Sequence, residues 1–309
     1  MKVLIVSGFL GAGKTTFIKQ LAQRSGRDFV VLENEYGQTG VDGALLDTPD
    51  KSMNVWELTE GCICCSMKAD FAASVLTIAN ALDPEFLVVE PTGVGMLSSI
   101  IANLRQIEYE RIALLRPITI LDGNSYARYM REFSSLYRDQ IEAAGLILFS
   151  KMERAEAEET NALAKQIRAL NPQAQVLPTH YAQMDDAWWA TILATLYDGS
   201  PCETAAAAQA PDLENLGLSG VRMPSAAHLV TFLEDVIRGE YGNIVRAKGF
   251  LRAGDQDCRF DVADDRYSIT GMEDMPESRA IFIGKDIARS RLRKQLLPLT
   301  RLRGARRAQ

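Results

Sequence analysis

The N-terminal two thirds of the chain alternates short, β-rich apolar runs with longer segments of helical periodicity. Most of these runs end in small or acidic residues: KVLIVSG (2–8), FVVLENE (29–35), FLVVEPTG (86–93), ITILDG (118–123), GLILFSK (145–151) and AQVLPTH (174–180). Buried strands separated by helices are typical of a parallel sheet with helices on its faces. The pattern therefore predicts an α/β fold built on a parallel sheet.

A change in composition separates this region from the rest of the chain. Between about Asp198 and Ala227 the periodicity is lost, and the stretch is rich in Ala, Pro, Gly and Ser, as linkers are. The residues that follow have the pattern of a helix, several strands and a final helix. We therefore expect an N-terminal domain over residues 1–197, a linker over 198–226 and a smaller C-terminal α+β domain over 227–309.

Composition narrows the class of protein. The chain has 309 residues, 47% of them hydrophobic, which is enough for two domains with buried cores. A formal net charge of −6 argues against broad binding to nucleic acid or to anionic membranes. The N-terminal sequence MKVLIVSGF lacks the features of a signal peptide, and no segment has the length of an uncharged membrane span. We therefore expect a soluble, cytoplasmic protein.

The strongest chemical signal is GFLGAGKT at residues 8–15, which fits G-x-x-x-x-G-K-S/T between a predicted strand and a predicted helix. Its glycines let the backbone curl so that successive N–H groups and the helix N-terminus point at a phosphate. Lys14 would neutralise β- and γ-phosphate oxygens, and the Thr15 hydroxyl would coordinate Mg²⁺. The predicted phosphate-binding set is Gly8, Gly11, Ala12, Gly13, Lys14, Thr15 and Thr16.

A nucleotide hydrolase of this kind needs an acidic residue at the end of a neighbouring strand, to hold the metal through water. The run FLVVEPTG supplies Glu90, followed three residues later by Gly93. The E-x-x-G form is typical of a subgroup of P-loop proteins in which the Gly93 N–H can approach the γ-phosphate. As an alternative, Glu90 could simply cap the next helix.

The base-binding segment of a GTPase is usually N-K-x-D at the end of a later strand, where the carboxylate accepts hydrogen bonds from guanine N1–H and N2–H₂. In this chain the segment FSKMER occupies that place. Ser150, Lys151 and Glu153 keep the chemical types, with a hydroxyl in place of the amide and a carboxylate arm one methylene longer. The segment therefore favours guanine.

An ordered set of motifs now resembles a known family. SGFLGAGKTT, ENEYGQTGVDG, EGCICC, EPTG and SKME, followed by RAKGFL and IFIGKDI in a small C-terminal domain, are similar to the CobW-type P-loop GTPases, which are related to HypB and UreG. The resemblance covers nearly the whole chain, and its most specific element is C-x-C-C. It implies a P-loop NTPase sheet flanked by helices, hydrolysis of GTP to GDP and phosphate, and binding and delivery of a transition metal such as zinc or cobalt.

Three of the five cysteines lie within four positions: Cys62, Cys64 and Cys65. An odd number of unevenly spread cysteines does not form a disulfide framework, and adjacent cysteines pair only with strain. Thiolates so placed suit Zn²⁺ or Co²⁺. The resemblance adds Glu33 as a metal ligand, whereas Gln38 stands where many relatives have a second glutamate. Alternatively, the cysteines are small buried hydrophobes beside Trp56.

Asp42, in the loop ENEYGQTGVDG, could reach Mg²⁺ or position the attacking water. We expect Glu33, Asp42 and the cysteines to lie on segments that flank the nucleotide. Loss of the γ-phosphate would then relax these segments and alter the affinity for metal, which would couple hydrolysis to metal binding.

The chain lacks the histidine-rich run that many relatives carry. Its two histidines, His180 and His228, are far apart in sequence and are expected to be structural. Neither Cys202 nor Cys258 is expected to be a ligand. Storage of metal is therefore not the expected task, whereas delivery to a client metalloenzyme or cofactor-loading protein remains open, as does a nucleotide-dependent homodimer.

Three functions remain open from the sequence. The first is a GTPase metallochaperone that delivers a metal to a client or activates it. The second is a GTPase that loads or protects an enzyme with an organic metallocofactor such as a corrinoid. The third is a regulatory binding protein that switches partners with nucleotide or redox state.

Overall fold

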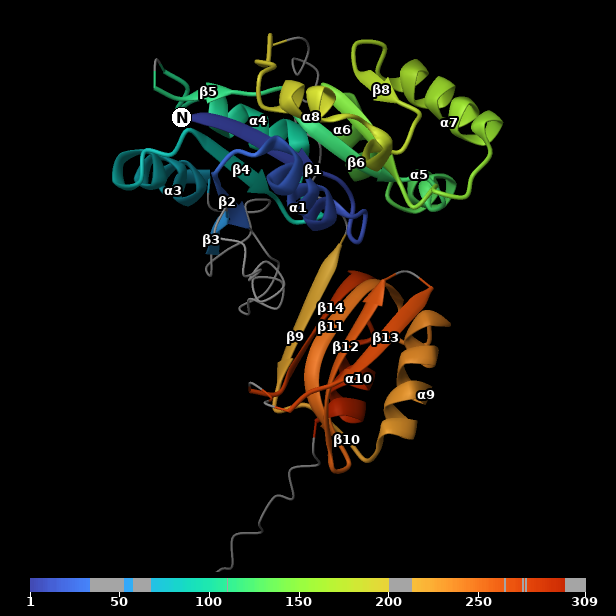
Figure 1. Ribbon diagram of the computed structural model, residues 1–309. Helices are drawn as coiled ribbons and strands as arrows, with labels where there is room; N and C mark the ends of the chain where they lie inside the picture. Colours follow the sequence, from blue (N-terminus) through green and yellow to red (C-terminus); the bar gives the residue numbers. More distant parts are fainter. Residues whose placement is uncertain are drawn as a thin grey trace, which may run out of the picture. The chain divides into compact units, whose positions relative to one another are not determined.

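The computed structural model describes residues 1–33, 53–57, 68–109, 111–199, 213–263, 265–273, 275 and 277–297. The chain divides into two compact units, Met1–Pro211 and Asp212–Gln309, and each has its own sheet and helices (Figure 1). Of the helices in these ranges, none is both long enough and apolar enough to cross a bilayer.

The first unit alternates strands and helices along the chain. Its elements are β1 (Lys2–Ser7), α1 (Lys14–Ser25), β2 (Phe29–Glu33), β3 (Met53–Glu57), α3 (Lys68–Ala81), β4 (Phe86–Glu90), α4 (Leu97–Arg105), β5 (Ala113–Leu114), β6 (Ile118–Asp122), α5 (Tyr126–Glu132), α6 (Ser134–Glu142), β7 (Leu146–Ser150), α7 (Ala157–Leu170), β8 (Gln175–Leu177), the 3₁₀ helix η1 (Tyr181–Gln183) and α8 (Asp186–Ile192).

The strands of this unit run in the order β3-β2-β4-β1-β6-β7-β8, with β5 beside β1. The pairings between them are parallel throughout the described residues. All six apolar runs form strands, so the predicted α/β fold is confirmed. Two short strands, β3 and β5, were not predicted, because MNVWE has no long apolar run and β5 has only two residues.

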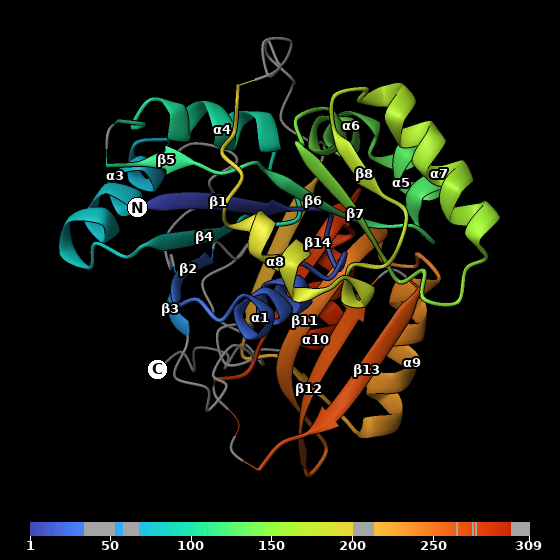
Figure 2. The ribbon, with the colours of Figure 1, turned by 45° about the horizontal axis from the view of Figure 1, so that its top comes forward.

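Helices cover both faces of the parallel sheet (Figure 2). On one face, alternate strand residues such as Leu4 and Val6 share a buried cluster with Phe17 of α1 and Trp189 of α8. The intervening strand residues point to the opposite face, where α4 packs against α3 and α6. Since every strand points the same way, their carboxyl ends lie along one edge of the sheet, and the loops that follow them meet there.

The second unit is an antiparallel sheet with helices against one face. Its strands run in the order β13-β12-β11-β14-β9, and β10 pairs with β11 in parallel. The elements are β9 (Glu214–Ser219), β10 (Arg222–Met223), α9 (Ala226–Ile237), β11 (Asn243–Ala253), β12 (Gln256–Ala263), β13 (Arg266–Gly271), β14 (Arg279–Lys285) and α10 (Arg289–Leu296).

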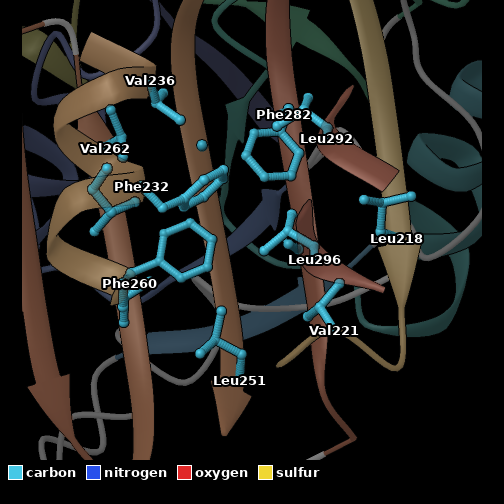
Figure 3. Close-up of a cluster of buried hydrophobic side chains, with 14 of the residues drawn as sticks. Leu218, Val221, Phe232, Val236, Leu251, Phe260, Val262, Phe282, Leu292 and Leu296 are labelled. Carbon is cyan, nitrogen blue, oxygen red and sulfur yellow. The ribbon is translucent and has the colours of Figure 1, made fainter. Parts of the chain in front are cut away.

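Side chains from the two helices and the sheet meet in one buried core (Figure 3). Phe232 of α9 lies against Phe282 of β14, with ring centroids 6.2 Å apart in an edge-on arrangement. Leu292 and Leu296 of α10 are fully buried in the same cluster. The smaller C-terminal α+β unit expected from the pattern of helix, strands and helix is therefore present.

The segment expected to be a linker is partly structured. Residues 214–219 form β9, which pairs with β14, and residues 222–223 form β10. Leu216 and Leu218 are buried in the sheet, but the glycine between them and the flanking polar residues weaken the alternation. The compact units divide between Pro211 and Asp212, earlier than the change in composition suggests.

Candidate active site

The loop between β1 and α1 is shaped by three glycines. Gly8, Gly11 and Gly13 all have positive φ angles, of 145°, 71° and 93°. A Cβ atom on Gly8 would lie 2.4 Å from the carbonyl oxygen of Ile120 on the neighbouring strand β6. Within the described residues, no side chain caps α1, whose N-cap residue is Gly13. A helix N-terminus that follows a glycine-rich loop is the kind of site that binds anions.

Lys14 lies across this loop. Its side chain is almost fully buried, and Nζ donates hydrogen bonds to the carbonyl oxygens of Gly8 at 3.2 Å and Phe9 at 3.4 Å. The ammonium group is thus held beside the same backbone whose N–H groups could bind phosphate. The arrangement is compatible with the predicted neutralisation of phosphate charge by Lys14.

Thr15 and Glu90, both predicted to hold Mg²⁺, are in direct contact. The Thr15 hydroxyl donates to the Glu90 carboxylate, with distances of 2.9 Å to Oε1 and 3.1 Å to Oε2. Oxygen donors of this kind are what Mg²⁺ prefers, so the pair fits a magnesium site. The alternative role for Glu90 is wrong, because the next helix begins at Leu97 and its N-cap residue is Met96.

Gly93 is in close contact with the loop between β1 and α1, which we call the phosphate loop. A Cβ atom on this residue would lie 2.4 Å from the backbone N of Leu10 and 2.8 Å from the carbonyl carbon of Phe9. The buried Gln140 of α6 donates from Nε2 to the carbonyl oxygens of Gly93 and Gly95, each at 3.1 Å. The segment after β4 is therefore held between the phosphate loop and α6.

The neighbouring residue of α6 holds the far end of the same segment. The buried Asp139 carboxylate accepts hydrogen bonds from the hydroxyl and the backbone N–H of Ser98 at the start of α4. Burial raises the pKa of Asp139, and the hydrogen bonds from Ser98 act in the opposite direction. Two consecutive residues of α6 thus fix the segment from Gly93 to Ser98.

The predicted base-binding residues lie at or after the carboxyl end of β7, and each contacts another segment of the unit. Ser150 is buried and donates to the carbonyl oxygen of Ala12 in the phosphate loop at 2.7 Å. Lys151 has a positive φ angle of 60°, and its Nζ lies 2.8 Å from Oδ2 of Asp122, at the end of β6. Oδ1 of Asp122 accepts from the backbone N–H of Asn124.

Glu153 is more exposed than its two neighbours in this segment. Its side chain is 61% accessible, and Oε1 lies 3.3 Å from Nε2 of His180 in the loop after β8. His180 also caps η1, because its Nδ1 accepts from the backbone N–H of Ala182 at 3.2 Å. The structural role expected for His180 is therefore present, and so is a contact with a predicted binding residue.

Glu33 lies at the end of β2, in register with Glu90 of β4 and Glu57 of β3. It is buried, whereas Cys62, Cys64, Cys65 and Asp42 lie outside the described residues. Within the described part of the chain, no group of three or more His, Cys, Asp or Glu residues could hold a metal ion. Cys258 is buried, and burial raises the pKa of its thiol.

Residues 2–178 match the family model for the CobW/HypB/UreG nucleotide-binding domain. The chain belongs to this family. Residues 222–299 also match the model for the Cobalamin synthesis protein cobW C-terminal domain. The resemblance inferred from the ordered motifs is therefore confirmed.

Two relatives in Escherichia coli (strain K12) are named Zinc chaperone YeiR and Zinc chaperone YjiA. Each is 31% identical to this CobW-family chain, over 184 and 192 residues, which are 59% of this chain and 56% and 58% of the relatives. Zinc-regulated GTPase metalloprotein activator 1 of Dictyostelium discoideum is 23% identical over 57% of this chain and 45% of its own length. The chain thus spans about half the length of the curated relatives it matches.

The sequence did not predict the residues that contact the candidate site residues of this CobW-family chain from other elements. Asp122 contacts Lys151, Gln140 contacts the segment after β4, and Glu153 is contacted by His180. Of these three contacting residues, only Asp122 could have been found from the sequence, because it is an acidic residue at the end of a predicted strand. The contacts of Gln140 and His180 join residues 47 and 27 positions apart, which a motif cannot encode.

Proposed function

We propose that this protein hydrolyses GTP and uses the cycle to bind a transition metal of the zinc or cobalt type and deliver it to a client metalloprotein. One observation carries the proposal: the contact between Thr15 and Glu90 beneath the phosphate loop, with Glu33 in register beside Glu90. The names of the relatives, zinc chaperones and a GTPase metalloprotein activator, support the same function.

In the proposed hydrolysis, the chain's own groups position and stabilise the phosphates. Lys14 neutralises charge that develops on the β- and γ-phosphate oxygens, and the Gly93 N–H approaches the γ-phosphate. Thr15 and Glu90 would hold Mg²⁺, which would further neutralise the phosphate charge when bound. Asp42 would position the attacking water. Ser150, Lys151 and Glu153 are proposed to select guanine.

Coupling to metal follows from the order of strands. Residues in register on adjacent parallel strands point their side chains to the same face of the sheet, with backbones about 4.8 Å apart. Glu33, the proposed ligand of the transition metal, therefore lies next to Glu90, the proposed support of Mg²⁺. Loss of the γ-phosphate could move Glu90, and that movement would be passed to Glu33 on the adjacent strand and so to the proposed transition-metal site.

The proposed transition-metal site consists of Cys62, Cys64, Cys65 and Glu33. Thiolates must lose their protons to bind, so binding should weaken as pH falls through the range where thiols protonate. The relatives' names support a client metalloprotein. A nucleotide-dependent homodimer stays a prediction.

The metal site is tested by Cys64→Ser, with metal binding and GTP hydrolysis measured in the presence of Mg²⁺. Co²⁺ added to the parent protein should give a thiolate-to-metal charge-transfer band in the near ultraviolet, and Cys64→Ser should lose most of it. Metal-stimulated hydrolysis should fall, whereas basal hydrolysis should stay nearly unchanged because Thr15 and Glu90 serve a different ion. Cys258→Ser is the matched control, because that thiol lies in the second unit.

Two results would contradict the metallochaperone function. One is binding of Co²⁺ and Zn²⁺ by Cys64→Ser with the affinity of the parent. The other is a parent protein that binds neither ion at micromolar concentrations with GTP present.

The choice of base is tested by competition with unlabelled GTP, ATP and XTP, and equal competition by ATP would exclude the assignment of Ser150, Lys151 and Glu153.

A further inference from the structure

The loop after β8 places His180 against the predicted base-binding segment. β7 and β8 are adjacent parallel strands, so the loops that follow them lie at the same edge of the sheet. His180 reaches Glu153 with Nε2 3.3 Å from Oε1; its side chain is 13% accessible and that of Glu153 is 61% accessible. A nearly buried imidazole thus contacts one oxygen of a carboxylate that is otherwise open to solvent.

The hydrogen bonds of His180 fix which nitrogen carries the proton. Nδ1 accepts from the backbone N–H of Ala182 at 3.2 Å, so in the neutral ring Nδ1 has no hydrogen and Nε2 carries it. Nε2 then carries its hydrogen at the atom that lies 3.3 Å from Oε1 of Glu153. The imidazole N–H, whose direction is fixed, thus lies beside a carboxylate, and a contact of an N–H with an ionised acceptor is stronger than one between two neutral groups.

The imidazole is itself held by the core of the unit. It stacks on Tyr181, with ring centroids 4.4 Å apart and an interplanar angle of 27°. Tyr181 is buried and packs edge-on against Phe17 of α1 at 5.2 Å. Burial, followed by the nearby charge of Glu153, raises the pKa of Tyr181 to about 12, so this ring stays neutral. His180 is thus connected through Tyr181 to the helix that begins at the phosphate loop.

We propose that His180 is a positioning residue for base recognition: it holds one oxygen of Glu153 so that the other accepts from the guanine edge. This inference rests on the proposed guanine site. A glutamate arm has one more rotatable bond than an aspartate arm, and ordering that bond costs free energy. The contact with His180 restricts the arm before the nucleotide arrives, which reduces this cost.

The ligand class follows from the chemistry of the carboxylate. Guanine presents two donors, N1–H and N2–H₂, to an acceptor that is fixed in place. Adenine presents the acceptor N1 at the same position, so a carboxylate held there repels it. Hypoxanthine keeps N1–H but lacks the 2-amino group. The ratio of the affinities for GDP and IDP therefore measures how well the Glu153 carboxylate is placed to accept from the 2-amino group of guanine.

The test uses His180→Phe in the full chain, with GDP and IDP affinities measured by displacement of a fluorescent guanine nucleotide. Phenylalanine keeps the stack on Tyr181 and removes the ring N–H that lies beside Glu153. We expect the preference for GDP over IDP to fall by about tenfold, the effect of about one hydrogen bond to a charged group, with kcat for GTP unchanged at saturation. His180→Asn, whose oxygen can still accept from Ala182 N–H but cannot reach Glu153, should give the same loss.

Two further variants separate a role through Glu153 from a role in folding. His180→Gln retains a side-chain N–H donor and should keep the parent preference within about threefold. Glu153→Ala should lower the preference on its own, and adding His180→Phe should then lower it no further. An additional loss in the double variant, or an unchanged preference in folded His180→Phe and His180→Asn, overturns the inference. If Glu153→Ala itself leaves the preference unchanged, the proposed guanine site fails instead.

Discussion

The two ends of the proposed nucleotide site, a phosphate end and a base end, are built in different ways. The phosphate end consists of the loop from Gly8 to Thr15 and the segment from Glu90 to Gly93, and most of its shape comes from backbone. The base end consists of Ser150, Lys151 and Glu153 with their contacts, and its shape comes from side chains. Backbone geometry demands particular residues, whereas side-chain chemistry allows substitutes.

This contrast between backbone and side-chain construction explains why the phosphate-binding motif has its usual residues, whereas the base-binding motif does not. At the phosphate end a glycine cannot be exchanged where another backbone lies closer than 3 Å to its Cβ position, as at Gly8 and Gly93. At the base end Ser150 and Glu153 replace the usual residues. Asp122 at the end of β6 contacts Lys151, and His180 in the loop after β8 contacts Glu153. The phosphate end should therefore be the more sensitive of the two to substitution.

The largest effect is expected from Lys14→Ala. Loss of the ammonium leaves the phosphate charge without its main cation, and we expect GTP hydrolysis to fall by about 10³-fold or more. The fold should survive, because alanine is the best helix former and the residue stands at the start of α1. Lys19→Ala in the same helix is the control. Parent-like hydrolysis by a folded Lys14→Ala protein would exclude the P-loop assignment.

Gly93→Ala should have the next largest effect. The added Cβ would lie 2.4 Å from the N and 2.6 Å from the Cα of Leu10, so the phosphate loop must shift. A displacement on the ångström scale at a catalytic centre costs about 10²-fold in rate, which single-turnover hydrolysis would reveal. Gly217→Ala is the matched control, because a Cβ there meets nothing within 4 Å. Equal activity in the two variants would mean that the loop adapts without cost.

At the base end, Asp122→Asn should have a smaller effect confined to nucleotide affinity. The amide keeps an oxygen for the turn at Asn124 but removes the negative charge beside Lys151. We expect KM for GTP to rise by about three- to tenfold, with kcat unchanged. Glu85→Gln, which removes the exposed partner of Arg27, should change neither parameter. A fall in kcat of Asp122→Asn would show that the two ends are not separable.

The fold and the phosphate end were predictable because their signals are local. Six apolar runs predicted six strands, and the spacing from Gly8 to Thr15 predicted the loop between β1 and α1. The register that sets Glu33 beside Glu90 depends on β4 lying between β1 and β2, an order that residue spacing alone does not give. The same holds for Gln140 and His180, whose contacts bring together separate elements.

The smallest effect concerns the support of the phosphate end by α6. Burial raises the pKa of Asp139 above the ordinary value of 3.8, although hydrogen bonds from Ser98 oppose this shift. An acid with a raised pKa in the folded state binds more protons folded than unfolded, so its contribution to stability is largest below the unfolded pKa. That contribution is lost as pH rises through the folded pKa and then stays constant.

Asp139→Asn removes this titration and retains one oxygen that can accept from Ser98. The free energy of unfolding of the parent minus that of the variant should therefore fall as pH rises from about 4, and level off once Asp139 is ionised in the folded state. Urea unfolding at a series of pH values measures this difference. A difference that grows with pH would mean that the hydrogen bonds from Ser98 outweigh burial, so that α6 holds the segment after β4 most firmly when Asp139 is charged.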